Sequence, residues 1–232
     1  MTEESAYAID PPPRPTIPVV GDRARFPVRR IWCVGRNYAE HAREMGADPD
    51  REPPFFFAKP GDAIVAGGGR IAFPPMTDDL QHEVELAVAI GRGGAGIAVA
   101  DAARHVFGYA VALDMTRRDL QAAAKRQARP WDVAKGFDHS CPIGRITPVA
   151  DFAVPEDAVL ELHVNGVVRQ RATLGDMIWT VADCIAELSR YVALAPGDLL
   201  LTGTPAGVAA VARGDILEAR CTGLAGLRVD YL

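Results

Sequence analysis

Three carboxylates stand within, or at the end of, two apolar runs of the sequence that have the character of β-strands. Glu83 and Glu85 lie in the run 81–90, and Asp114 ends the run 107–114. Because successive side chains of a strand point to opposite faces, Glu83 and Glu85 share one face of their strand. Like charges at this spacing repel each other unless a positive charge lies between them. Three carboxylates without a thiolate or an imidazole favour a hard cation such as Mg²⁺ or Mn²⁺.

The same spacing has a second interpretation that needs no metal. Glu83 and Glu85 would line the solvated face of a half-exposed sheet, which is a common arrangement, and Asp114 would cap a helix. The residues by themselves leave both interpretations open.

A short helix is expected after residue 37. Asn37, followed three residues later by Glu40, resembles a capping box. The helix carries His41 and Glu44 one turn apart and therefore on one face. On local evidence these two residues read as a pair on the surface. A helix of this length is marginal by itself, so we expect its ordering to depend on a ligand.

A second helix is expected over residues 116–127, which are good helix formers and rich in basic residues. The basic run invites the hypothesis of a nucleic-acid or acidic partner. The formal net charge of −5 argues against a nucleic-acid binder, which would usually be basic. A solvated helix face with a few site residues is the favoured interpretation. Lys135, which follows in a loop, reads by itself as a solvated lysine.

The composition is that of an ordinary globular protein. A chain of 232 residues with 49% hydrophobic and 24% charged residues can bury a sizeable core, as one large domain or as a domain with an arm. No apolar run reaches the roughly 18 residues of a membrane span, and the acidic start lacks the features of a signal peptide. The four cysteines are scattered, as in reduced proteins of the cytoplasm. We therefore expect a cytoplasmic protein with no membrane or nucleic-acid partner.

Strand patterns outnumber helix patterns along the chain. Residues 1–27 are rich in proline, which removes backbone donors that a strand ladder needs, and they predict an extended surface arm. Residues 28–232 are expected to form a single domain. Within it, Asn165-Gly166 is a hairpin signal and residues 180–191 have the period of an amphipathic helix. Without β-α-β-α alternation, the pattern favours an α+β, β-rich mixed roll with a few short helices.

Taken together, several segments resemble the fumarylacetoacetate hydrolase family. The matching segments are CVGRNY (33–38), HARE (41–44), HEVEL (82–86), LDMTRRD (113–119), PWDVAK (130–135) and LTGTPAG (201–207). They run in the order of the family and cover nearly everything from residue 30 onward. The arm and the run 131–140 look most like the bacterial branch that hydrolyses fumarylpyruvate. The resemblance implies the mixed β-roll of the family's C-terminal domain, with residues 28–232 as one catalytic domain, and a homodimer.

The resemblance also implies a metal centre and a catalytic pair. A divalent ion, Mg²⁺ or Mn²⁺, would be held by the positions matching Glu83, Glu85 and Asp114. His41 and Glu44 would form a pair on a lid helix, in which Glu44 orients His41 as the general base for a water molecule.

Further site residues are implied in the same way. Lys135 would meet a developing oxyanion. The residues expected to bind the substrate, a 2-oxo acid, are Arg36, Arg118, Gln121 and Thr204.

The reaction implied is hydrolysis of the C–C bond of an acylpyruvate, and fumarylpyruvate would give fumarate and pyruvate. Because the family mixes hydrolases, decarboxylases and isomerases, the fold leaves the reaction open. Alternatives on the same site are decarboxylation of oxaloacetate, which needs no activated water, and isomerisation of a 2-hydroxydienoate. An alternative of another class is a non-catalytic binding module that docks an acidic partner through the basic helix 117–129.

Overall fold

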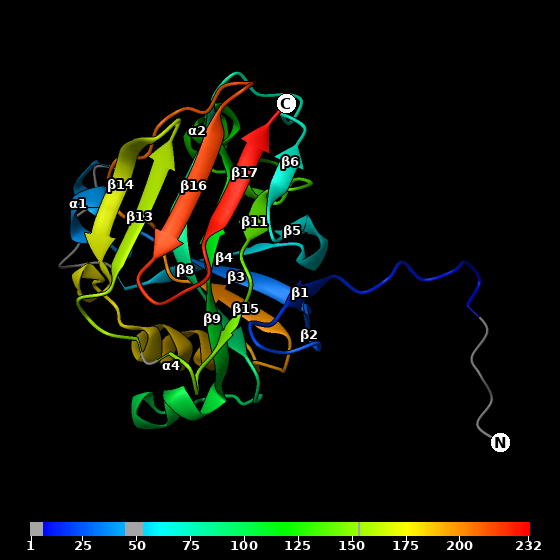
Figure 1. Cartoon of the computed structure of the whole chain (residues 1–232), viewed down its shortest axis with the longest axis vertical. Helices are drawn as coiled ribbons and strands as arrows, with labels where there is room; N and C mark the ends of the chain where they lie inside the picture. The colour runs from blue at the N-terminus through cyan, green and yellow to red at the C-terminus, as the bar shows by residue number, and fades with distance from the viewer. Residues whose placement is uncertain (1–6, 45–52, 153) are drawn as a thin grey trace.

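The computed structural model describes residues 7–44, 53–152 and 154–232, and at its centre lies a large mixed sheet (Figure 1). The strands of this sheet, in spatial order, are β4 (Phe55–Lys59), β3 (Arg30–Gly35), β15 (Asp198–Leu201), β8 (Val84–Ile90), β9 (Val106–Leu113), β11 (Cys141–Ile143) and β5 (Ile64–Ala66), with β12 (Thr147–Pro148) beside β9. Most neighbours are antiparallel, but β15 is parallel to β3, and β11 is parallel to β5. This mixture of directions confirms the predicted fold class.

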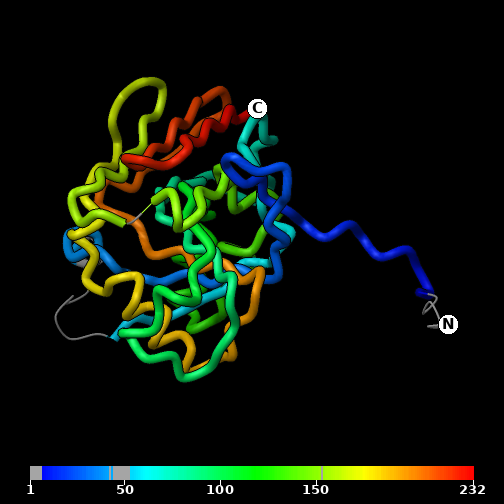
Figure 2. Tube along the Cα trace, turned by 60° about the horizontal axis from the view of Figure 1, so that its bottom comes forward, coloured from blue at the N-terminus to red at the C-terminus, as the bar shows by residue number. Residues whose placement is uncertain are grey.

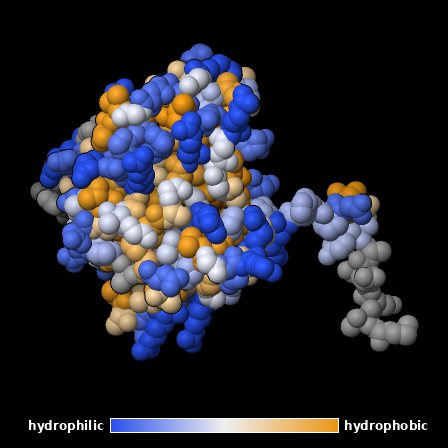
Figure 3. All heavy atoms as spheres, in the orientation of Figure 1, coloured by the Kyte–Doolittle hydropathy of each residue, from blue (hydrophilic) through white to orange (hydrophobic). Residues whose placement is uncertain are grey.

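A second sheet packs over one face of the first. Its strands, in spatial order, are β14 (Val167–Thr173), β13 (Val159–Val164), β16 (Ile216–Cys221), β17 (Leu227–Tyr231) and β6 (Gly69–Ile71). Leu160 and Leu162 of β13 are fully buried against the large sheet. The opposite face carries charged side chains such as Arg171 and Arg220, and Figure 3 shows many hydrophilic residues over these strands.

The remaining described elements are short. The paired strands are β1 (Thr16–Pro18) with β2 (Arg25–Pro27), and β7 (Leu80–Gln81) with β10 (Thr116–Arg117). The α-helices are α1 (Ala39–Glu44), α2 (Arg118–Arg126), α3 (Asp132–Lys135) and α4 (Val181–Tyr191), and 3-10 turns occupy Gly61–Ala63, Val99–His105 and Leu174–Asp176. Helix α4 lies where the sequence predicts it. Helix α2 begins two residues later than predicted, because Thr116 and Arg117 pair with β7 as strand β10. None of the described helices has the length and apolar character needed to cross a membrane.

The strand β8 separates two apolar clusters of the core. Val84 and Leu86 belong to the cluster between the two sheets. Ala87 and Ala89, on the alternate face, belong to a second cluster that the β1–β2 hairpin helps to cover. By the same alternation, Glu85 lies on the face of the two alanines.

The predicted hairpin is present between β13 and β14. Asn165 and Gly166 form its turn, with φ angles of 51° and 79°. A type I′ turn requires positive φ at both positions, and asparagine and glycine adopt it more readily than other residues. The turn places Val164 opposite Val167 and fixes the register of the pair.

The predicted surface arm is observed only in part. Residues 7–15 have no regular secondary structure and extend away from the body in both views (Figures 1 and 2). The hairpin of β1 and β2 follows, and its Ile17 and Phe26 are buried in the second apolar cluster. Pro18 and Pro27 stand at strand ends, where a missing backbone donor costs little. The expectation of a surface arm is therefore wrong for this hairpin.

Leu160 tests how far the packing of the two sheets stabilises the chain. Leu160→Ala is expected to lower the free energy of unfolding by about 2–5 kcal/mol, because it removes buried carbon atoms and leaves a cavity. Urea denaturation followed by tryptophan fluorescence measures the change. Val168→Ala, at a side chain that is 46% exposed on β14, is the control and is expected to change stability by less than about 0.5 kcal/mol. Equal effects of the two substitutions would contradict this account of the core.

Candidate active site and metal centre

The ends of β8 and β9 bring the three carboxylates together. These strands pair Glu85 with Ala112, and the backbone N–H of Asp114 donates to the carbonyl of Glu83 at 2.8 Å. One carboxylate oxygen from each acidic residue lies within 4.8 Å of the others. All three side chains are buried, so the interpretation as a solvated strand face is wrong. Asp114 does not cap the helix that follows, because the N-cap of α2 is Arg117.

Two lysines and an arginine offset much of this buried negative charge. Lys135 Nζ donates to Glu83 at 2.6 Å and to Asp114 at 2.8 Å. Lys59 Nζ lies 2.8 Å from the other oxygen of Asp114, and Arg118 pairs with Glu83. Burial by itself would lower the pKa of Lys135, but Asp114 and Glu83 raise it above its usual value. Burial also opposes ionisation of Glu83, yet Lys135 and Arg118 hold its pKa below the usual range.

Glu85 is the carboxylate that these cations compensate least. Among the described residues, no lysine or arginine forms an ion pair with it. Its Oε2 accepts a hydrogen bond from the N–H of Gly203 at 2.7 Å. Burial and the charges of Asp114 and Glu83 raise the pKa of Glu85 above its usual range. Because a divalent cation bound to the three oxygens would relieve this repulsion, the donor set fits Mg²⁺ or Mn²⁺.

The loop after β15 approaches the carboxylates closely. Gly203 has a φ of +94°, which favours glycine, and a Cβ there would stand 2.7 Å from the Cβ of Asn37. The hydroxyl of Thr204 donates to the carbonyl of Val84 at 2.9 Å and accepts from Gln170 Nε2 at 2.8 Å. These bonds fix the loop between the large sheet and β14.

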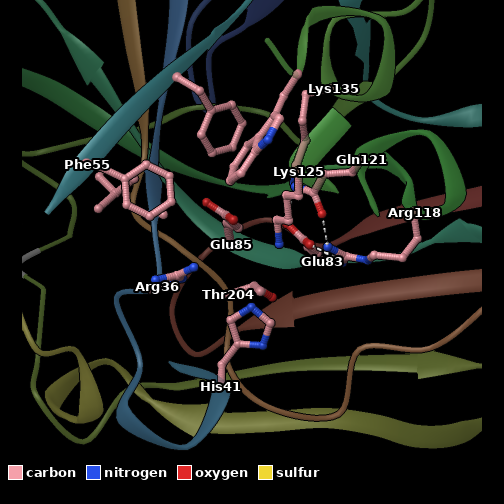
Figure 4. A pocket seen from close by; sticks show the side chains of 14 residues that line it. Arg36, His41, Phe55, Glu83, Glu85, Arg118, Gln121, Lys125, Lys135 and Thr204 are labelled. Atoms are coloured by element: carbon pink, nitrogen blue, oxygen red, sulfur yellow. Dashed lines mark hydrogen bonds and ion pairs between the residues drawn. The ribbon is translucent and has the colours of Figure 1, made fainter. Parts of the chain in front are cut away.

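A pocket opens beside the carboxylates (Figure 4). The predicted site residues that line it are Arg36, His41, Glu83, Glu85, Arg118, Gln121, Lys135 and Thr204. In the view of Figure 4, Arg118 and Gln121 stand on one side of the glutamates, and Arg36 and Phe55 stand on the other. Arg118 donates to Gln121 Oε1 at 2.6 Å and to Gln81 Oε1 at 2.7 Å, so its guanidinium is held in place. Asp114 is fully enclosed and does not itself line the pocket.

His41 enters this pocket from α1. It is buried, so the interpretation as a surface residue is wrong. Glu44 ends α1, but its side chain lies outside the part of the structure that is described, and the predicted His41–Glu44 pair stays a prediction. The expected capping role of Asn37 is wrong. Its side chain bonds instead to the backbone of Trp179 and of Thr202, at 2.7–2.9 Å.

Lys59 is a site residue that the sequence analysis missed. It is 1% exposed, and besides its contact with Asp114 it donates to the carbonyls of Met115, at 3.1 Å, and of Lys135. It therefore ties β4 to the two segments that carry Asp114 and Lys135. The available signal was a lysine at the end of the apolar run 55–59. That signal is weak, because lysines at strand ends are usually solvated.

The arrangement joins three chemical elements in one pocket. The carboxylates form a hard ligand set, Lys135 offers a fixed ammonium donor, and His41 offers an imidazole. Arg118 and Gln121 add donors for a carboxylate. Together these groups suit reactions of a 2-oxo acid in which negative charge develops on oxygen.

Replacing Lys59 by methionine breaks a buried ion pair. We expect Lys59→Met to lower the free energy of unfolding by about 3 kcal/mol, the lower end of the range for such a loss, because Lys135 still faces Asp114. Chemical denaturation measures the effect. Lys125→Met, at an exposed lysine, is the matched control and should change stability by less than about 0.5 kcal/mol. A Lys59→Met protein as stable as the wild type would refute the anchoring role.

Glu85→Gln tests the metal centre through stability instead of turnover. Mn²⁺ or Mg²⁺ should raise the unfolding temperature of the EDTA-treated wild type, because an ion that binds the folded chain stabilises it. The metal-free variant should unfold about 2–4 °C above the metal-free wild type, since about 1 kcal/mol of repulsion is relieved. It should gain little from added metal. Scanning calorimetry measures both shifts, and an equal metal-induced gain in the two proteins would argue against this site.

Several known proteins are similar to this chain in sequence or in structure. The crystal structure of a fumarylpyruvate hydrolase from Pseudomonas aeruginosa in complex with Mn²⁺ and pyruvate matches with a TM-score of 0.95 and 46% identity, covering 98% of this chain and 99% of that one. A mitochondrial oxaloacetate tautomerase of Arabidopsis thaliana is 44% identical over 87% of this chain and 90% of the relative. A mitochondrial oxaloacetate decarboxylase of Dictyostelium discoideum is 42% identical over 84% of this chain and 90% of the relative.

The family model for the fumarylacetoacetate (FAA) hydrolase C-terminal region matches residues 30–230. This match spans both sheets and every element that carries a residue of the pocket. The resemblance noted in the sequence is confirmed, and the chain belongs to the fumarylacetoacetate hydrolase family.

Proposed function

We propose that this protein is a metal-dependent hydrolase that cleaves the C–C bond of an acylpyruvate, with fumarylpyruvate as substrate and fumarate and pyruvate as products. The observation that carries the proposal is the convergence of buried carboxylates, Lys135 and His41 in one pocket. It is supported by similarity to the fumarylpyruvate hydrolase with Mn²⁺ and pyruvate, which extends over 98% of this chain.

The metal would be held by Glu83, Glu85 and Asp114. When bound, Mg²⁺ or Mn²⁺ would supply the Lewis acidity that stabilises the enolate of the departing pyruvate. Lys135, whose ammonium form is favoured by Glu83 and Asp114, would donate to the oxygen on which negative charge develops. Such a donor is worth about 10²–10³ in rate.

His41 is proposed as the general base, with Glu44 orienting it. The imidazole would take a proton from a water molecule while the water oxygen bonds to the acyl carbonyl carbon. The bond between that carbon and the adjacent methylene carbon then breaks, and the methylene carbon receives a proton to give pyruvate. General base catalysis of this kind contributes about 10²–10⁴ in rate.

Arg118, Gln121 and Thr204 are proposed to orient the carboxylate beside the keto group. The bonds of Arg118 to Glu83 and Gln121 fix its guanidinium before a substrate arrives, and such preorganisation reduces the entropy lost on binding. Thr204, whose hydroxyl already donates to Val84, would contact the substrate from the loop after β15.

Tautomerisation or decarboxylation of oxaloacetate is the second candidate. It is favoured by the names of the relatives that are 44% and 42% identical to this chain. Stabilisation of an enolate is common to all these reactions. Hydrolysis also requires an activated water and tautomerisation a group that transfers a proton, whereas decarboxylation requires neither. His41 therefore separates hydrolysis from decarboxylation. A homodimer and a cytoplasmic location, which the sequence led us to expect, stay predictions.

Hydrolysis and decarboxylation make different demands on His41 and the same demand on Asp114. His41→Ala should reduce kcat for fumarylpyruvate by about 10²–10⁴ and leave most of any decarboxylation of oxaloacetate, because decarboxylation needs no activated water. Asp114→Asn should reduce all activities together. Both substrates are assayed with the wild type and both variants at saturating Mg²⁺. If His41→Ala still cleaves fumarylpyruvate at the wild-type rate, His41 is not the general base. If the wild type turns over oxaloacetate far faster than fumarylpyruvate, the second candidate replaces the first.

A further inference from the structure

The pocket contains a lysine, Lys125, to which the proposed reaction gives no role. Among the described residues that line it, the lysines and arginines are Arg36, Arg118, Lys125 and Lys135, and the carboxylates are Glu83 and Glu85. Two of the cations pair with Glu83. Of the other two, Arg36 was expected to bind the substrate, whereas Lys125 has no role in the steps above.

Lys125 lines the pocket without forming an ion pair among the described residues. It lies on α2 one turn after Gln121, so both side chains lie on the same face of the helix. Its side chain is exposed and yet lines the pocket, and its Nζ stands 5.1 Å from the ring centroid of Trp131. No carboxylate of the described residues lies within ion-pair distance of it. Burial, followed by the charges of Arg118 and Arg36, lowers the pKa of Lys125, so these cations repel one another.

Arg36 reaches the pocket from the end of β3 at a backbone position that most residues avoid. Its φ is 60°, in the left-handed region. The guanidinium carbon stands 5.6 Å from the ring centroid of Phe55. In Figure 4 it lies across the glutamates from Arg118. The pocket therefore has cations at both ends of the carboxylate group.

Aromatic rings line the pocket near these two cations. Trp131 meets Phe55 edge-on at 5.6 Å and Phe57 at 5.8 Å between ring centroids. All three residues line the pocket. Flat apolar faces of this kind suit a planar, conjugated chain, whereas a carboxylate at the end of such a chain requires a cation.

We propose that Lys125, together with Arg36, binds the carboxylate at the far end of the acyl chain, so that the enzyme selects acylpyruvates with an unsaturated chain ending in a carboxylate. Arg118 and Gln121 then serve the carboxylate next to the keto group, and the aromatic residues contact the chain between the two ends. This assignment rests on the proposed function and names the substrate class of the same site. An anion between Lys125 and Arg36 also relieves their mutual repulsion.

Kinetics with two acylpyruvates test the assignment. Fumarylpyruvate carries the distal carboxylate, and acetylpyruvate ends in a methyl group. Lys125→Met should lower kcat/KM for fumarylpyruvate by about fivefold to tenfold, the size expected for a charge-assisted contact at a partly exposed site, mainly through KM. It should leave kcat/KM for acetylpyruvate unchanged. Lys125→Arg should retain most of the preference.

Arg126→Met is the matched control, because it removes a positive charge from the next position of the same helix, outside the pocket lining. It should leave both kcat/KM values unchanged. Equal losses on the two substrates in Lys125→Met, or the same loss of preference in Arg126→Met, would overturn the assignment.

A binding experiment separates failure of this assignment from failure of the proposed function. The probes are 2-oxoheptanedioate and 2-oxoheptanoate, which have chains of equal length and lack the second keto group that hydrolysis needs. Titration calorimetry with the Mn²⁺-loaded wild type should give about fivefold to tenfold tighter binding of the dioate, and Lys125→Met should remove the difference. Equal binding by the wild type would overturn the subsite. Selective binding by a wild type that hydrolyses no acylpyruvate would support the subsite and refute the proposed reaction.

Discussion

Enclosing three carboxylates at the ends of β8 and β9 is the constraint on which the rest of the site depends. Unpaired charges in such a place are too costly to persist, so cations must arrive from elsewhere in the chain. Lys59 comes from the end of β4, Arg118 from the start of α2 and Lys135 from the end of α3. The edge strand β4 and the helices α2 and α3 therefore have an electrostatic role in the site. They leave Glu85 as the least compensated carboxylate, and a divalent ion held by the three carboxylates would offset its charge.

The parts of the site that could be predicted are those whose signal is local. The alternation of side chains along a strand predicts that Glu83 and Glu85 lie on one face. The position of Asp114 at the end of the next apolar run makes it a candidate third ligand. Asn165-Gly166 specifies its turn through backbone conformation, so the hairpin also followed from two residues. The family resemblance then supplied what local patterns lack, namely which distant segments meet.

The parts that could not be predicted depend on partners far away in the sequence. Nothing beside Lys59 indicates that its strand ends against a buried aspartate. Asn37 has the sequence context of a helix cap, but its side chain bonds to backbone groups of Trp179 and Thr202 instead. Only the tertiary fold brings these groups near. The prolines of the first segment suggested an arm, but the apolar Ile17 and Phe26 between them gain more from burial in the second cluster.

The cations around the carboxylates have a consequence for how the protein matures in a cell. In zinc fingers the metal is itself the source of folding energy, and the chain is unfolded without it. Here Lys59, Arg118 and Lys135 already balance most of the buried charge, so the chain can reach its final shape before any ion is captured. Folding and loading are then separate events. The identity of a bound ion would then follow the supply of magnesium and manganese around the folded protein, because oxygen ligands of this kind discriminate weakly between the two.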